Sequence, residues 1–246
     1  MIEPLLLTGA AISTFYGDRP LTNASGFYFE RESKLYLITS RHVVFDEQGK
    51  HFPTRIQIEL HLGLDDVARS TAFSIPLYRY GRAAWREASD RSGSVDVAAI
   101  EIDLGALPRS AAYRAFTPRH IAGNYDSVEA GTSLLVVGFP LGFHDTLHHM
   151  PVVRHAIIAS SFGLRFQGEG YFLTDGRTHR GSSGSPVVTR AVDAGTEHGD
   201  LPWMLVGIHS ARIDVGTRDR ILDEALGLNT AWYADILLAL TETTSR

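Results

Sequence analysis

The stretch HRGSSGSPVV, residues 179–188, places two glycines and three serines directly before a proline and an apolar run. Glycine adopts backbone conformations that other residues avoid, so such a stretch fits an ordinary turn. It fits equally a loop that directs backbone N–H groups toward a reacting oxygen. The sequence on either side must distinguish these two interpretations.

The flanking sequence consists of short apolar or alternating runs separated by glycine, proline and charged turns. Residues 55–62, RIQIELHL, alternate strictly, and residues 27–40 predict two strands joined by a charged turn. Further strands are expected at residues 71–77, 94–103, 133–140, 152–160, 170–174, 186–189 and 203–210. Because no helical crossovers separate these runs, we predict an all-β protein, a sandwich or a barrel.

Three segments depart from the strand pattern. Residues 104–127 contain two prolines and no alternation, so we expect them to link two β units, 1–113 and 114–246. Residues 190–202 are expected to form a polar surface loop. Near the C-terminus, Trp232, Ile236 and Leu240 fall four residues apart. This spacing predicts an amphipathic helix over residues 230–241, capped by Asn229 or Thr230 and packed on the β body.

The composition excludes several classes of protein. The chain has 246 residues and a net charge of -5, and no basic patch dominates it. Nucleic acid and anionic membrane are therefore not expected partners. The absence of cysteine excludes disulfides, zinc thiolates and a cysteine nucleophile. The apolar stretch near the N-terminus is too short to span a bilayer, and Glu3 and Pro4 precede it where a signal peptide is basic. We expect this stretch to form an opening strand or a docking arm.

Cysteine-free composition and the acidic start of the chain together predict a cytoplasmic localisation, although secreted proteins can also lack cysteine.

Three residues far apart in the sequence have the chemistry of a nucleophilic triad. His42 follows an apolar run, Asp96 lies inside another, and Ser183 lies in the glycine- and serine-rich stretch. A serine hydroxyl needs a base, a histidine can take and return the proton, and a buried carboxylate orients the imidazole. Each residue alone has an ordinary structural explanation, but a buried carboxylate needs a partner. Together they predict a triad, with the amides of Gly181 and Ser183 as the oxyanion hole.

With these residues, the sequence resembles the trypsin/chymotrypsin-like serine protease superfamily, and within it the bacterial Deg-type proteases and glutamyl endopeptidases. The family pattern G-x-S-G-[GS]-P matches residues 181–186, T-x-x-H-V matches 39–43, and D-[IVL]-A matches 96–98. Residues 24–29 and 136–142 resemble two further family segments. The resemblance implies two antiparallel six-stranded β-barrels with the active site between them. Residues 1–113 would carry His42 and Asp96, and residues 114–246 would carry Ser183.

The resemblance implies a serine endopeptidase that acts on proteins or peptides without a cofactor. Ser182 stands where pancreatic-type members carry the Asp that pairs with a freed N-terminal amine, so activation by N-terminal cleavage is not expected. An esterase on the same fold is one alternative function. Another is a latent or regulatory protease-fold module that needs a protein partner to become active.

The pocket for the residue before the scissile bond maps to residues 177–181 and 207–212. Thr178 and His209 match positions of glutamyl endopeptidases, and both side chains can donate to a carboxylate. Positive potential would come from Arg177, Arg180 and Arg212, and backbone bonds to an extended substrate from Ser210 and its neighbours. These matches predict cleavage after Glu. The alternative is that His209 packs beside the triad and that the arginines face solvent, with Arg212 narrowing the pocket.

A histidine-rich stretch, residues 143–155, is the other candidate site. His144 and His148 have the i, i+4 spacing of a metal-binding helix, and Asp145, His149 and His155 lie nearby. However, Met150 and Pro151 interrupt the stretch, and the family has a surface loop there. We therefore predict no metal site.

Overall fold

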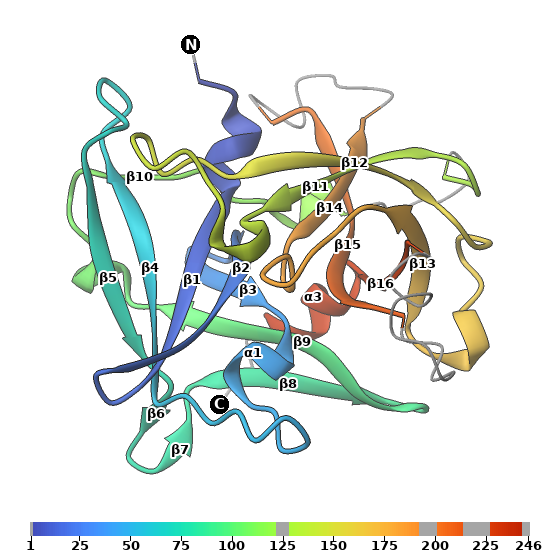
Figure 1. Ribbon diagram of the computed structural model, residues 1–246, viewed down its shortest axis with the longest axis horizontal. Coiled ribbons are helices and arrows are strands. Elements are labelled where there is room, and N and C mark those ends of the chain that lie inside the picture. The colour runs from blue at the N-terminus through green and yellow to red at the C-terminus, as the bar shows by residue number, and fades with distance from the viewer. Residues whose placement is uncertain (1, 122–127, 192–200, 214–226, 243–246) are drawn as a thin grey trace.

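A computed structural model describes residues 2–121, 128–191, 201–213 and 227–242 (Figure 1). The first ten strands are β1 (Gly9–Tyr16), β2 (Arg19–Arg31), β3 (Lys34–Thr39), β4 (Arg55–Leu62), β5 (Ser70–Pro76), β6 (Tyr78–Arg79), β7 (Arg82–Ala83), β8 (Trp85–Asp90), β9 (Gly93–Ile102) and β10 (Ala111–Ala112). The others are β11 (Ser133–Gly138), β12 (Val152–Ile158), β13 (Tyr171–Gly176), β14 (Pro186–Arg190), β15 (Trp203–Arg212) and β16 (Leu228–Tyr233). Two short α-helices are α1 (Arg41–Val44) and α3 (Ile236–Leu240). The prediction of a mostly β protein is confirmed.

The N-terminal half of the chain forms an eight-stranded antiparallel sheet. Its order is β10-β4-β1-β2-β3-β9-β8, with β5 paired to β4. The charged turn predicted between β2 and β3 is present, and Glu32 and Ser33 both have positive φ, as a tight hairpin requires. Strand β4 buries Ile56, Ile58 and Leu60, so its alternating sequence faces the core as predicted.

The C-terminal half forms a closed six-stranded barrel. Its strand order is β11-β12-β13-β16-β15-β14, and β14 pairs with β11 to close the ring. One of the two predicted six-stranded barrels is therefore confirmed. The other is corrected: residues 9–112 form a larger sheet, and no strand pair closes it within the described part of the chain.

The C-terminal helix begins later in the structure than the predicted range of residues 230–241. Residues 228–233 form strand β16, which pairs with β13 on one side and β15 on the other, and the helix α3 covers only Ile236–Leu240. Asn229 and Thr230 therefore lie in a strand and cap no helix. The fourfold spacing of Trp232, Ile236 and Leu240 is misleading because barrel closure satisfies the backbone groups of residues 228–233. Trp232 and Leu240 are both buried, but from different elements.

The two sheets share one hydrophobic core. Phe27, Phe29 and Tyr36 of the N-terminal sheet belong to the same buried cluster as Leu205 and Trp232 of the barrel. Figure 1 shows the barrel on the right, most of the N-terminal sheet on the left and α1 between them in the view. Among the described residues, no helix has the length and apolar composition needed to span a membrane.

Candidate active site

His42 lies on α1, the single helical turn that follows β3. Strand β3 pairs with β9 so that Thr39 lies opposite Ala98. This register brings His42 next to Asp96. The His42 backbone N–H donates to Asp96 Oδ1 over 2.9 Å, and His42 Nδ1 lies 2.8 Å from Asp96 Oδ2. The carboxylate therefore fixes both the main chain and the ring orientation of the histidine, and the imidazole remains 38% exposed.

The charges around this pair shift both pKa values. Burial lowers the pKa of His42, but the hydrogen bond and negative charge of Asp96, together with the charge of Asp46, raise it more, so the net shift is upward. Burial raises the pKa of Asp96, but its hydrogen bond to His42 and the His42 charge outweigh burial, and the net shift is downward. The pair thus favours a carboxylate next to an imidazole that accepts protons readily.

Ser210, on β15, connects the carboxylate to the predicted nucleophile. Its hydroxyl donates to Asp96 Oδ2, and its carbonyl accepts a hydrogen bond of 2.9 Å from Ser183 Oγ. His42, Asp96, Ser210 and Ser183 therefore belong to one hydrogen-bonded group. The backbone of Ser210 was predicted to bind an extended substrate, which stays a prediction, and its side chain supports the carboxylate. Since a hydroxyl carries one proton, Ser183 must turn from the Ser210 carbonyl before it can donate to His42.

The carbonyls of the loop before and around Ser183 are held from three sides. Arg180 C=O accepts from Leu141 N–H over 2.5 Å. Gly181 C=O accepts from the Ser25 hydroxyl over 2.7 Å, and Ser183 C=O accepts from Ser25 N–H over 3.0 Å. Within the loop, Ser182 C=O accepts from Ser185 N–H over 3.0 Å. The orientation of four successive peptide groups is therefore fixed.

The N–H groups of the same four peptides fall into two pairs. Those of Ser182 and Gly184 donate to the carbonyls of His179 and His209. In the described part of the chain, those of Gly181 and Ser183 donate to no protein acceptor. A trans peptide points its N–H away from its C=O, so Gly181 N–H points away from Leu141. The two amides that remain without an acceptor among the described residues are therefore the two that the sequence predicts as oxyanion donors.

Gly181 can occupy this loop only because it has no side chain. Its φ is +89°, and a Cβ would lie 2.7 Å from the Phe139 carbonyl oxygen and 2.9 Å from Leu141 N. The flexibility noted in residues 181–185 is therefore used, at this position, for a left-handed backbone and a close approach to the segment 139–142.

Thr178 is buried and already donates a hydrogen bond. Its hydroxyl lies 2.5 Å from Asn229 Oδ1, while Asn229 Nδ2 donates to the carbonyls of Gly176 and Gly227. The hydroxyl that was predicted to meet a substrate carboxylate is thus committed to Asn229. Sequence reasoning assigned Asn229 only to a helix cap, because the pairing of β16 with β13 that brings it near Thr178 is not readable from the local pattern.

His209 lies on the buried side of β15 and is 2% exposed. Its Nδ1 has no hydrogen-bond partner among the described residues. Burial, reinforced by the nearby charge of His42, lowers the pKa of His209 to about 4. The ring is therefore neutral at physiological pH, with one buried nitrogen unpaired.

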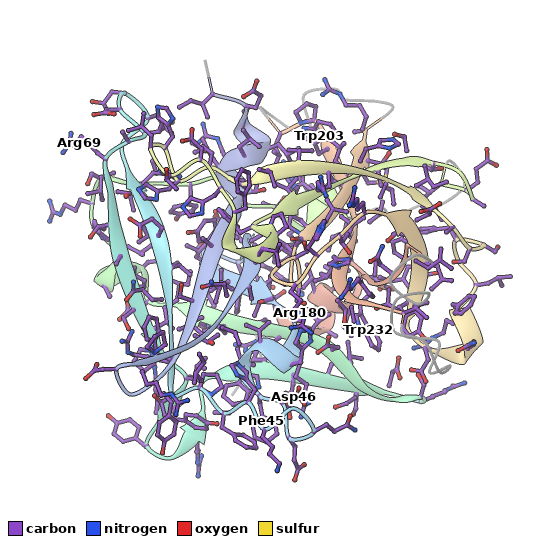
Figure 2. All side chains as sticks on the ribbon, viewed as in Figure 1. Phe45, Asp46, Arg69, Arg180, Trp203 and Trp232 are labelled. Atoms are coloured by element: carbon purple, nitrogen blue, oxygen red, sulfur yellow. The ribbon has the colours of Figure 1, made fainter. Side chains whose placement is uncertain are left out.

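The three predicted arginines are all exposed. Arg212 lies opposite Asn229 in the β15–β16 pairing, and the Arg177 carbonyl accepts from Arg154 Nε over 3.1 Å. In Figure 2 the side chain of Arg180 lies near the centre of the view, whereas Arg69 and Trp203 lie toward the edges. The three arginines of the predicted pocket segments are therefore accessible to solvent.

The histidine-rich stretch forms turns rather than a metal-binding helix. His148 Nδ1 lies 2.6 Å from Asp145 Oδ2, and the His144 ring stacks on the His149 ring at 5.8 Å. His155 lies on β12 and contacts the hydroxyl of Ser133. In the described ranges, no group of three or more His, Asp or Glu side chains is arranged to hold a metal ion.

A cavity of about 450 Å³ lies beside the site, where β8 and β9 face the barrel. Its lining includes Val95, which precedes Asp96, together with Asp90, Arg165, Trp232 and Ile236. None of the residues predicted for catalysis or for the substrate pocket lines it.

The family is established by comparison with known proteins. The model of the trypsin-like peptidase domain matches residues 24–193, and the protein belongs to this family. A comparison of the sequence with curated proteins finds no match. The roles of His42, Asp96, Ser183 and the pocket residues stay predictions.

Several solved structures share the fold. The serine endoprotease of Yersinia pestis is 17% identical with a TM-score of 0.55, and the match covers 96% of this chain and 62% of that chain. The inactive form of the Rv3671c protease of M. tuberculosis is 15% identical with a TM-score of 0.54, covering 97% and 91%. The inactivated protease paralogue S-I1 of the scabies mite is 14% identical with a TM-score of 0.56, covering 97% and 94%. The fold is therefore chymotrypsin-like, and this chain spans less than two thirds of the Yersinia pestis chain.

Proposed function

We propose that this protein is a serine endopeptidase. In this proposal, Ser183 is the nucleophile, His42 the general base and acid, and Asp96 the group that orients His42. The observation that carries the proposal is the arrangement of the loop at Ser183. The loop that carries the hydroxyl also has two amides, those of Gly181 and Ser183, without an acceptor among the described residues. The same hydroxyl is linked through Ser210 to the His42–Asp96 pair.

The proposed reaction has two half-reactions. Ser183 Oγ attacks the scissile carbonyl carbon while its proton passes to His42 Nε2, and the oxyanion accepts hydrogen bonds from the amides of Gly181 and Ser183. The tetrahedral intermediate expels the amine, which takes the proton from His42, and an acyl-enzyme remains. Water then attacks the acyl group by the same route, and the acid and Ser183 are released. Asp96 stays ionised and stabilises the imidazolium in both half-reactions.

A fluorophosphonate probe tests this proposal without knowledge of the substrate. The probe phosphonylates an activated serine, so the wild type should be labelled and Ser183→Ala should not. Ser185→Ala is the matched control, because it deletes a hydroxyl two positions away that is fully buried and has no partner among the described residues. Labelling of Ser185→Ala should persist. A folded wild type that takes no label, or a labelled Ser183→Ala variant, would contradict the proposal.

We further propose that the enzyme cleaves after Glu. The support is the unpaired Nδ1 of buried His209 and the positive potential of Arg177, Arg180 and Arg212. Thr178 adds little as a donor, since its proton is already shared with Asn229. The recognition of a carboxylate would then depend on His209 and on the exposed arginines.

A peptide series that varies only the residue before the scissile bond tests this specificity. We expect the largest kcat/KM for Glu, and Gln at the same position is the matched neutral control. Arg180→Gln should lower kcat/KM for the Glu peptide and leave the Gln peptide nearly unchanged. Faster cleavage after Lys or Leu than after Glu would overturn the acidic preference while leaving the proposed peptidase activity intact.

A latent module is the second candidate function, and one observation favours it. Ser183 donates its proton to the Ser210 carbonyl, which is an arrangement that does not yet activate the hydroxyl. In a latent protein, a regulatory protein partner would turn Ser183 toward His42. A wild type that becomes labelled by fluorophosphonate only when a cell extract is added would support this candidate.

A further inference from the structure

Ser25 lies on β2 of the N-terminal sheet, far in sequence from the loop that carries Ser183. The residue is fully buried, with an exposed fraction of 0%. Its backbone N–H donates to the carbonyl of Ser183, and its own carbonyl accepts from the Thr39 hydroxyl over 2.8 Å. Ser25 is therefore fixed between the nucleophile and the end of the strand that leads to His42.

The Ser25 hydroxyl contacts two separate segments of the chain, one as a donor and the other as an acceptor. It donates to the Gly181 carbonyl over 2.7 Å and accepts from the Phe139 N–H over 2.9 Å. Phe139 directly precedes the short turn Pro140–Gly142, in which Leu141 N–H holds the Arg180 carbonyl. The hydroxyl thus joins the two segments whose relative position sets the direction of Gly181 N–H.

We propose that Ser25 is a positioning residue for the oxyanion hole, and this inference rests on the proposed function. The carbonyls of Gly181 and Ser183 are both held by Ser25, the first through its hydroxyl and the second through its amide. Without the hydroxyl, the Gly181 carbonyl and the Phe139 amide lose their partner inside the protein. The peptide group after Gly181 then keeps only the hydrogen bond from Ser182 N–H to the His179 carbonyl. The segment 139–142, whose Leu141 N–H holds the Arg180 carbonyl, loses its hydrogen bond to Ser25, so the direction of Gly181 N–H is less tightly fixed.

The packing around Ser25 prevents a water molecule from replacing the hydroxyl. A Cβ at Gly138 would lie 2.6 Å from Ser25 Oγ and 3.2 Å from Ser25 Cβ, so the surroundings are in close contact. Removal of one oxygen atom leaves a space smaller than a water molecule needs. Ser25→Ala should therefore leave both backbone groups unsatisfied while changing the packing little.

The test compares Ser25→Ala with Thr8→Val. The Thr8 hydroxyl is also fully buried and makes one hydrogen bond, to the Leu5 carbonyl over 2.7 Å. Labelling by fluorophosphonate at several probe concentrations separates the apparent binding constant from the maximal rate. We expect the maximal rate to fall by about 10- to 100-fold in Ser25→Ala, with the binding constant nearly unchanged. In Thr8→Val the maximal rate should stay within about threefold of the wild type, even though the melting temperature of this variant falls.

Ser25→Cys is the conservative variant. The thiol keeps a donor and an acceptor at this position, although sulfur is larger than oxygen and is a weaker donor, and the chain contains no other cysteine that could pair with it. Its maximal rate should lie between those of Ser25→Ala and the wild type, and it takes the place of Ser25→Ala if that variant does not fold.

The outcomes separate this inference from the proposed function. A folded, unlabelled wild type refutes the proposed function and, with it, the role of Ser25. A labelled wild type whose maximal rate is shared by Ser25→Ala and Ser25→Cys refutes the role of Ser25 alone. The role of Ser25 is also refuted if the maximal labelling rate falls equally in Ser25→Ala and Thr8→Val and the fall follows their loss of stability.

Discussion

Replacement of Gly181 by Ala tests the oxyanion loop most directly. Two structural costs are expected. The first is the left-handed backbone, with φ at +89°, which costs a non-glycine residue about 1–3 kcal/mol. The second is steric, because the new Cβ would lie 2.7 Å from the Phe139 oxygen and 2.9 Å from Leu141 N. Both neighbours are backbone atoms, so relief of the contact must displace the loop or the segment 139–142.

Gly131 provides a closely matched control. It has the same φ of +89°, and a Cβ at this position would meet no atom within 4 Å. Gly131→Ala therefore carries the backbone cost alone. The free energy of unfolding, from urea denaturation, should fall in both variants. The additional loss in Gly181→Ala should be about 1–3 kcal/mol, the usual cost of forcing extra atoms into a packed site.

The effect on activity should differ far more than the effect on stability. Displacement of Gly181 N–H removes one of two oxyanion donors, so the rate of fluorophosphonate labelling should fall by about 100- to 1000-fold. Gly131→Ala should keep nearly the wild-type rate. If the two alanine variants, both folded, are labelled at the same rate, Gly181 N–H has no part in the reaction and the assignment of the oxyanion hole is wrong.

Three further predictions concern the titrating groups. The pKa of His42 is raised above 6.5, so the labelling rate should fall as the pH drops, with a midpoint above 6.5; a midpoint below 6.5 contradicts the geometry of the pair. Ser210→Ala removes a hydrogen-bond donor to Asp96, so the pKa of Asp96 should rise and the labelling rate should fall about 10-fold. A labelling rate equal to that of Ser185→Ala would show that the Ser210 hydroxyl does not support Asp96 in the reaction. His209 has its pKa lowered from 6.5 to about 4 by folding. Its contribution to stability is therefore complete above pH 6.5 and lost as the pH falls toward 4, by roughly 3 kcal/mol in all. His209→Gln should show a weaker loss than the wild type between pH 7 and pH 4.5 in urea denaturation, and equal losses would contradict this.

Much of the fold is readable from the sequence because local patterns specify it. The alternation of residues 55–62 and the short apolar runs elsewhere predict strands that the structure contains. Residues 228–240 show where such patterns are ambiguous: a fourfold spacing fits a helix, but pairing with β13 and β15 makes residues 228–233 a strand. The choice depends on partners far away in the sequence, which a local pattern does not contain.

The candidate site, like the fold, is predictable where local sequence specifies it and not where distant residues pair. The short motifs around His42, Asp96 and Ser183 carry the chemistry in their residue types, so the sequence alone suggests all three. The hydrogen bond from Ser25 to Gly181 joins residues 156 positions apart, and nothing near Ser25 in the sequence signals it. The pairing of Thr178 with Asn229 is equally remote, which is why Thr178 was assigned to the substrate rather than to a protein partner.

The hydrogen bonds at the site imply that it forms only when both halves of the fold are docked. The barrel supplies Ser183 and its loop, but two carbonyls of that loop depend on Ser25 of the N-terminal sheet. In the reverse direction, Asp96 of the N-terminal sheet depends on Ser210 of the barrel for one of its donors. Because unpaired buried polar groups are costly, neither half has a satisfied site by itself. A small displacement between the halves would therefore disturb the oxyanion amides and the carboxylate together, which couples the order of the candidate site to the docking of the two sheets.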